Sequence, residues 1–230
     1  MSQQLTLSVA LRDDARFANF YAKHNEAAVF ALQQFWNPDS DWFVYLYGPA
    51  GVGCSYLLQA SCHLADGLGH SNVYLPLDEL QKYGPHVLDD LEQLSLVAID
   101  HVDAVIGQPE WEEALFYLFN RMKDSGKRLL ISAKELPSYL GCYLPDLESR
   151  LKWGVTYQIH DLNDEEKAAA LLLRAEKRGL ALSEDVAKFL LTRVSRNMSD
   201  ILNHLDLLDR ESLREQRKIT IPFVKETLKL

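Results

Sequence analysis

Apolar and polar positions follow two different periods along this chain, and the changes between them predict its elements. Short apolar runs, the pattern of buried strands, occupy residues 43–47, 73–77, 94–99, 128–132 and 155–159. Between them, apolar residues recur at helical spacing in residues 55–64 and 111–122. Pro76 lies inside the second run, which indicates a strand at the edge of a sheet. This alternation predicts an α/β fold, with a five-stranded parallel sheet flanked by helices.

The strand pattern stops near residue 162, and only helical spacing follows. We expect helices at residues 164–178, 184–193 and 198–217, and a short final helix that begins at Pro222. Residues 1–12 have the pattern of an extended tail, and apolar spacing indicates helical segments from residue 13 to 36. We therefore predict a tail (1–12), an α/β domain (13–162) and a small helical lid domain (163–230).

The composition is that of a folded protein in a reducing compartment. Apolar residues make up 47% of the 230 residues and aromatic residues 10%, which excludes wholesale disorder. No apolar run reaches the roughly 18–20 residues that a membrane span needs, and the first residues do not resemble a secretion signal. The three cysteines are too scattered for a disulfide framework or a zinc site. We expect a soluble, cytoplasmic protein without membrane contact.

The charge is unevenly divided. The formal net charge is −9, with −10 on residues 1–162 and +1 on residues 163–230. An acidic chain is a poor general binder of DNA, so any contact with DNA is expected to be indirect. Arg210, Arg214 and Arg217 could form a nucleic-acid stripe, but acidic residues interleave with them at helical spacing. A solvated face held by salt bridges is the more probable interpretation.

A glycine-rich loop lies between the first strand and the first helix of the α/β domain. It matches the phosphate-binding P-loop pattern at every element except the lysine, where Cys54 stands. In such loops, backbone N–H groups and the helix N-terminus bind phosphate. Without a lysine, we expect triphosphate to be bound less favourably relative to diphosphate. The predicted phosphate-binding residues are Gly48, Pro49, Ala50, Gly51, Val52, Gly53, Cys54, Ser55 and Tyr56.

The third apolar run ends on a carboxylate, Asp100. Beside a P-loop, this pattern predicts a Walker B aspartate that holds Mg²⁺ together with Ser55, directly or through water. A strand-end aspartate that only caps a turn is the alternative. His101 occupies the position at which ATPases of this build usually carry a second acidic residue, so we expect weak or absent hydrolysis.

Arg150 follows a helical stretch just before the fifth strand. Its guanidinium could project beyond the chain and serve as an arginine finger for a partner's nucleotide. On chemistry alone, a surface salt bridge to Asp146 or Glu148 is the role that the spacing favours.

The tail carries a second motif that could engage a partner. Gln4 precedes the alternating apolar residues Leu5 and Leu7, a pattern that can lie extended across a groove. A disordered terminus is the alternative.

Together these motifs resemble the AAA+ ATPases, more closely the central region of the bacterial replication initiator DnaA, and most closely the Hda subfamily of DnaA homologues. The resemblance covers nearly the whole chain. The stretches that carry it are residues 4–7, 74–78, 94–97, 144–147, 149–151, 153–154, 216–218 and 220–230.

The resemblance implies a function in the negative regulation of replication initiation. Hda proteins bind ADP or another nucleoside diphosphate. They dock on the DNA polymerase sliding clamp through a motif that Gln4, Leu5 and Leu7 match, and reach DNA only through the clamp. They stimulate ATP hydrolysis by DnaA with an arginine finger that matches Arg150. The implied protein is a DNA replication inhibitor, cytoplasmic and associated with the nucleoid through the clamp; a homo-oligomer is an open alternative to a monomer.

The chain departs from the family pattern at several positions. Ser8 and Val9 follow the clamp motif where a proline or an apolar residue is common. The sensor 1 position falls on Lys134, and the sensor 2 arginine is replaced by Ser199, with Arg196 one turn earlier. We predict that Lys134 and Arg196 contact the nucleotide, and that Lys134 returns the positive charge missing at residue 54; a solvent-facing lysine is the alternative.

Two other functions are compatible with the sequence. One is an autonomous AAA+ ATPase or a clamp-loader-like subunit, against which Cys54 and His101 argue. The other is a DNA-binding adaptor that uses the arginines of the lid, against which the acidic α/β domain argues.

Overall fold

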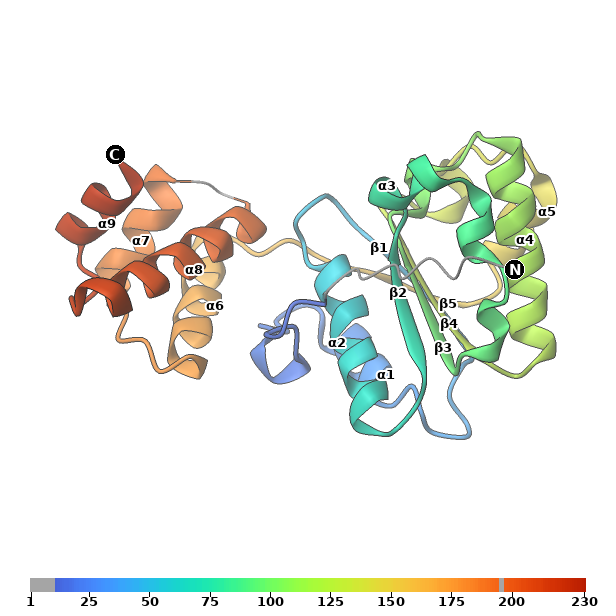
Figure 1. The fold of residues 1–230 in the computed structure, drawn as a ribbon, viewed down its shortest axis with the longest axis horizontal. Helices are drawn as coiled ribbons and strands as arrows, with labels where there is room; N and C mark the ends of the chain where they lie inside the picture. Colours follow the sequence, from blue (N-terminus) through green and yellow to red (C-terminus); the bar gives the residue numbers. More distant parts are fainter. Residues whose placement is uncertain (1–10, 195–196) are drawn as a thin grey trace.

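The computed structural model describes residues 11–194 and 197–230. Figure 1 shows an α/β domain and a smaller helical lid domain joined by a single connection after the last strand. Within the described residues, no helix combines the length and the apolar character that crossing a bilayer requires.

A five-stranded sheet forms the centre of the α/β domain, in the order β2-β3-β4-β1-β5, and every neighbouring pair is parallel. This confirms the predicted fold class. The strands are β1 (Phe43–Tyr47), β2 (Asn72–Pro76), β3 (Leu96–Asp100), β4 (Arg128–Ala133) and β5 (Val155–Gln158). Pro76 ends the edge strand β2, as predicted, because proline has no backbone N–H to donate and is tolerated at a sheet edge.

Helices cover both faces of the sheet (Figure 1). The helices α1 (Glu26–Gln33) and α2 (Cys54–Gly67) pack on one face, and α3 (Leu77–Leu80), α4 (Pro109–Asp124) and α5 (Pro145–Leu151) on the other. Short 3-10 helices lie at Phe17–Asn19, Gln81–Tyr83, Pro85–Leu88, Leu91–Gln93, Val102–Ala104 and Pro137–Tyr139. Each face therefore has its own apolar core.

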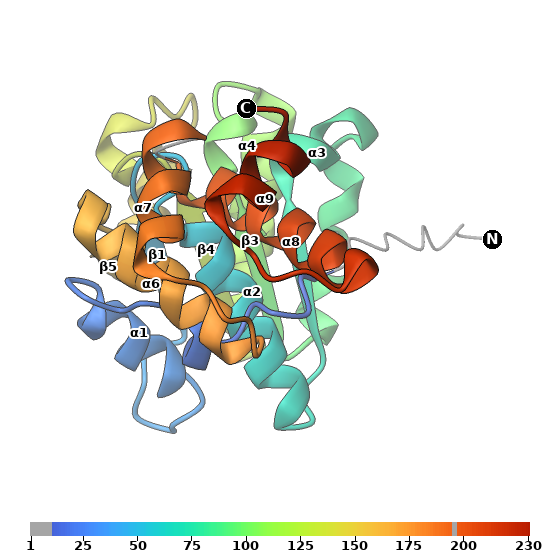
Figure 2. The ribbon, with the colours of Figure 1, turned by 90° about the vertical axis from the view of Figure 1, so that its left-hand side faces the viewer.

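The lid contains α6 (Asp164–Lys177), α7 (Glu184–Arg193), α8 (Met198–Glu215) and α9 (Ile221–Leu228) around a third apolar core. Its helices stand in front of the sheet in the view of Figure 2. Asn163 and Glu166 form a capping box at the start of α6, which satisfies two backbone N–H groups at the point where the lid begins.

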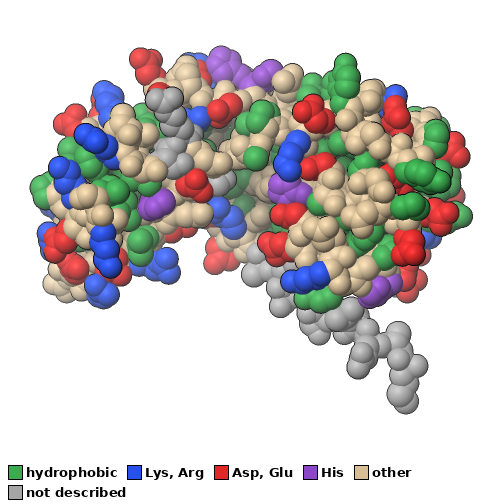
Figure 3. Space-filling view, turned by 90° about the horizontal axis from the view of Figure 1, so that it is seen from above, with side chains coloured by type: hydrophobic (Ala, Val, Ile, Leu, Met, Phe, Trp, Pro, Cys, Tyr) green, Lys and Arg blue, Asp and Glu red, His purple; other side chains and the backbone are tan. Residues whose placement is uncertain are grey.

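The surface charges follow the division seen in the sequence. On the face drawn in Figure 3, basic side chains gather on the lid and acidic ones on the α/β domain. Arg214 pairs with Glu211, and Arg217 pairs with Glu215. These pairs agree with the interpretation of the arginines at the end of α8 as part of a salt-bridged face.

Candidate functional site

A cavity of about 380 Å³ lies between the α/β domain and the lid. Its walls come from the glycine-rich loop, the N-terminal segment before α1, the end of β4 and the start of α8. All nine predicted phosphate-binding residues, Gly48 to Tyr56, line it, and so do Lys134 and His101. The volume is within the usual range of small-ligand sites, roughly 300–1,000 Å³.

The glycines of the loop adopt a backbone that other residues rarely reach. Gly51 has φ +86° and Gly53 has φ +114°. A Cβ at Gly51 would lie 2.6 Å from the side chain of Asn197 on the lid, and one at Gly53 would lie 2.8 Å from Phe20. Gly53 also caps α2, so the N-terminus of that helix opens on the cavity. Free N–H groups and the helix dipole together favour an anion at this point.

Cys54 brings no positive charge to the loop. Burial, and next the charge of Asp100, raise the pKa of its thiol to about 12, so the group is neutral at physiological pH. Lys134 lines the cavity, but its Nζ lies 3.1 Å from Oδ2 of Asp103 and its side chain is 56% exposed. Its predicted contact with the nucleotide remains a prediction.

Asp100 is fully buried and does not line the cavity. Its Oδ2 accepts a hydrogen bond from the hydroxyl of Tyr74 at 2.5 Å, and its Oδ1 accepts from the Ser132 hydroxyl and the backbone N–H of His101. Burial and the charge of Asp100 raise the pKa of Tyr74, which keeps this hydroxyl a donor. Tyr74 and Ser132 were not predicted, because only the fold brings their strands beside Asp100.

His101 stands between the two predicted metal ligands. Its Nε2 lies 3.4 Å from Oγ of Ser55 and 3.7 Å from Oδ2 of Asp100. Mg²⁺ requires near-octahedral oxygen ligands at about 2.0–2.1 Å. A nitrogen between the serine and a buried carboxylate that already accepts three hydrogen bonds does not fit that ion. Among the described residues, no three His, Cys, Asp or Glu side chains gather as a metal site.

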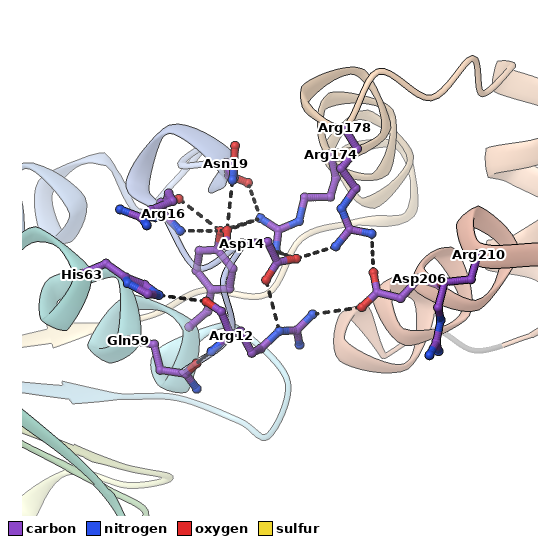
Figure 4. Close-up of polar contacts among 11 residues, drawn as sticks. Arg12, Asp14, Arg16, Asn19, Gln59, His63, Arg174, Arg178, Asp206 and Arg210 are labelled. Carbon is purple, nitrogen blue, oxygen red and sulfur yellow. Dashed lines mark hydrogen bonds and ion pairs between the residues drawn. The ribbon is translucent and has the colours of Figure 1, made fainter. Parts of the chain in front are cut away.

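The N-terminal segment bridges the cavity wall and the lid (Figure 4). Asp14 accepts hydrogen bonds from Arg174 in α6 at 2.7 Å and from Arg178, the residue that follows this helix, at 2.5 Å. Its backbone oxygen accepts from the hydroxyl of Tyr56, the residue after the P-loop serine, at 2.6 Å. Arg174 is 2% exposed and also lines the cavity. Asp14 thus connects the lid, through its carboxylate, to Tyr56 beside the glycine-rich loop, through its backbone oxygen.

Further charges extend this network to α8. Arg12 lies 3.4 Å from Asp14 and 3.8 Å from Asp206, and Arg178 also pairs with Asp206. Burial alone would raise the pKa of Asp14, but the guanidinium groups of Arg174, Arg12 and Arg178 outweigh it and hold that pKa below its ordinary value. No local pattern indicated this network, because its members come from positions as far apart as Arg12 and Asp206.

Arg150 lies in the last turn of α5 and is not part of the cavity wall. Its Nε donates to Oδ1 of Asn120 at 3.2 Å, and its guanidinium lies 4.3 Å from the centre of the Trp153 ring. Within residues 11–194 and 197–230, Arg150 forms no ion pair with Asp146 or Glu148, which the spacing alone had favoured. Stacking on an aromatic ring suits the planar guanidinium and leaves its charge uncompensated.

Four predicted site residues lie outside the described residues. They are Gln4, Leu5 and Leu7 of the tail, and Arg196 before α8. The predictions made for them stay predictions.

Two family models match the chain, one on each domain. The bacterial DnaA ATPase domain matches residues 11–158, and the lid domain of Hda matches residues 164–228. The first match alone covers more than half of the chain.

Several solved structures share this fold. Domain III of the Thermotoga maritima replication initiation protein DnaA superposes with a TM-score of 0.77 at 22% identity, over 96% of this chain and 98% of that one. AMPPCP-bound DnaA from Aquifex aeolicus gives 0.70 at 22%, over 90% and 71% of the two chains. The Thermotoga maritima RuvB Holliday junction branch migration motor gives 0.64 at 15%, over 93% and 73%. At these identities, the likeness establishes the fold alone.

Proposed function

The chain belongs to the family of bacterial DnaA ATPase domains and carries a lid of the Hda type, and from this premise we propose that it is a regulatory AAA+ protein. In this proposal it binds a nucleoside diphosphate, docks on the DNA polymerase sliding clamp and stimulates ATP hydrolysis by DnaA in trans. The outcome is ADP-bound DnaA and negative regulation of replication initiation.

The position of Arg150 is the observation that carries the proposal. The guanidinium lies off its own chain's cavity and has no carboxylate partner among the described residues. An arginine that compensated a local charge would be paired with an acidic group. An arginine available to the nucleotide of a neighbouring molecule has the environment observed here, and such fingers accelerate phosphoryl transfer by about 10³–10⁵.

The cavity supports binding of a diphosphate in preference to hydrolysis of a triphosphate. The loop backbone and the N-terminus of α2 favour phosphate, and DnaA from Aquifex aeolicus is a structural relative with bound AMPPCP. However, Cys54 is neutral where the lysine of a P-loop would offset the β- and γ-phosphates. His101 stands where a carboxylate would orient the attacking water. ADP is therefore the ligand we propose, held as a stable part of the structure.

Docking on the clamp would give the protein its access to DNA. We assign this contact to Gln4, Leu5 and Leu7, since a glutamine followed by spaced apolar residues suits a groove. Binding to the clamp turns the encounter with DNA-bound DnaA into an intramolecular event and so raises the effective concentration. An acidic α/β domain needs no DNA surface of its own in this arrangement. In the cell, we expect a cytoplasmic protein that follows the clamp on the nucleoid.

The test is an Arg150→Ala variant assayed for stimulation of DnaA ATP hydrolysis in the presence of clamp loaded on DNA. We expect stimulation to fall by about a thousandfold or to the background, while ADP binding and clamp binding persist. Arg193→Ala, which changes an exposed arginine of the lid, is the matched control and should retain stimulation. Stimulation that survives in Arg150→Ala would refute the assigned role.

A further inference from the structure

We propose that the cavity binds its nucleoside diphosphate without Mg²⁺, and that the imidazole of His101 occupies the place that the ion would need. This inference rests on the proposed nucleotide binding and specifies the ionic form of the ligand. The groups around Ser55 do not provide the oxygen ligands that a magnesium ion needs.

A magnesium ion at a P-loop has to reach both the serine hydroxyl and the acidic side chain, directly or through water. That carboxylate must therefore face the phosphates with free lone pairs. Asp100 is 0% exposed and absent from the cavity wall, so it does not face the phosphates. Three hydrogen bonds already occupy most of its lone pairs, one from Tyr74 to Oδ2 and two, from Ser132 and the backbone of His101, to Oδ1.

The backbone fixes the imidazole in place. His101 has φ +54°, a left-handed conformation, and its N–H donates to Oδ1 of Asp100 at 3.1 Å. The side chain reaches the loop, where Nε2 lies 3.4 Å from Oγ of Ser55. The ring also lines the cavity. The space between the serine and the carboxylate is thus filled by a group of the chain itself.

Imidazole is a poor substitute for the oxygen ligands that Mg²⁺ selects. It can instead donate an N–H to a phosphate oxygen, as the loop backbone does. The remaining positive potential comes from the N-terminus of α2 and from the cationic side chains in the cavity wall, Arg12, Lys134 and Arg174. Since Lys134 pairs with Asp103 and Arg174 with Asp14, this potential is moderate and suits a diphosphate better than a triphosphate.

The experiment is calorimetric titration of the full-length protein with ADP, once with millimolar Mg²⁺ and once with EDTA. We expect the two dissociation constants to agree within about threefold. Binding that is about tenfold or more tighter with Mg²⁺ would overturn the inference while leaving the proposed function intact. No ADP binding under either condition would overturn the nucleotide site itself, and with it this inference.

A variant tests whether His101 is the residue that excludes Mg²⁺. His101→Asp keeps the left-handed backbone, which aspartate tolerates better than most residues, and places carboxylate oxygens beside Ser55. We expect its ADP affinity to rise by about tenfold or more on addition of Mg²⁺. His86→Asp makes the same change at an exposed histidine outside the cavity and should remain indifferent to the ion. If His101→Asp is equally indifferent, the imidazole is not what excludes Mg²⁺, and its assignment is overturned.

Discussion

Asp14→Asn removes the carboxylate that connects the N-terminal segment to Arg174 in α6 and to Arg178 at the end of that helix. Arg174 is 3% exposed at its side chain and Asp14 is 22% exposed, so the pair is largely buried. Removing one partner of a buried pair costs about 3–5 kcal/mol, whereas exposed pairs contribute about 0–1 kcal/mol. Because Asp14 retains some contact with water and an amide keeps one acceptor oxygen, we expect a loss of about 2–3 kcal/mol in the free energy of unfolding.

Chemical denaturation measures this loss, and hydrogen exchange locates it. At about 2–4 °C per kcal/mol for a chain of this size, the melting temperature should fall by about 4–12 °C. Exchange should accelerate first in α6, because that helix loses its tie to the α/β domain. Nucleotide affinity should also fall, since Arg174 lines the cavity and is paired with the Asp14 carboxylate.

The effect should depend on pH in a defined direction. The native pKa of Asp14 lies below its ordinary value of 3.8, so its ionic contribution is present above that pH and is lost as the pH falls through the lower native pKa. The difference between wild type and variant should therefore shrink in acid. Asp13→Asn, at an exposed neighbour, is the control. If both variants lose the same stability at neutral pH, the network does not hold the lid.

Two further predictions concern buried or capping carboxylates. Glu112 is 0% exposed and accepts hydrogen bonds from the backbone N–H of Gly107 and from those of Tyr143 and Leu144, just before α5. Glu112→Ala should therefore lower the free energy of unfolding in urea by about 3–5 kcal/mol and weaken the stimulation that depends on Arg150. A loss below about 1 kcal/mol would contradict this prediction. The backbone N–H of Asn163 donates to Glu166 and lowers the pKa of that carboxyl to about 2. The stability difference between wild type and Glu166→Gln should therefore disappear as the pH falls from about 4.5 to about 2, which melting curves at several pH values measure. A difference that stays constant with pH would contradict the role of this carboxylate as a helix cap.

Local sequence patterns predicted the sheet and the glycine-rich loop after β1 because both arise from short-range regularities. The three central strands, β1, β3 and β4, are nearly continuous apolar runs, as expected for strands covered on both faces. The loop can be predicted because its backbone requires glycine: Gly51 and Gly53 have positive φ angles and no space for a Cβ. The short helices at residues 77–93 have no such regularity, and they were not predicted.

The rest of the site depends on contacts that no local pattern contains. Asp14 meets Arg174 across 160 positions, and Tyr74 meets Asp100 only because two strands pair. For Arg150, helical spacing alone favoured an ion pair that the structure does not contain among the described residues. Acidic residues stand two and four positions before it, yet its guanidinium stacks on Trp153.

The most direct test of the central claim is phosphate release from ATP by three samples: this protein alone, DnaA alone, and the two together with clamp loaded on DNA. Our account predicts negligible release by this protein alone and a rate in the mixture far above that of DnaA alone. Rapid release by this protein alone, with no increase in the mixture, would contradict regulation in trans and indicate an autonomous ATPase.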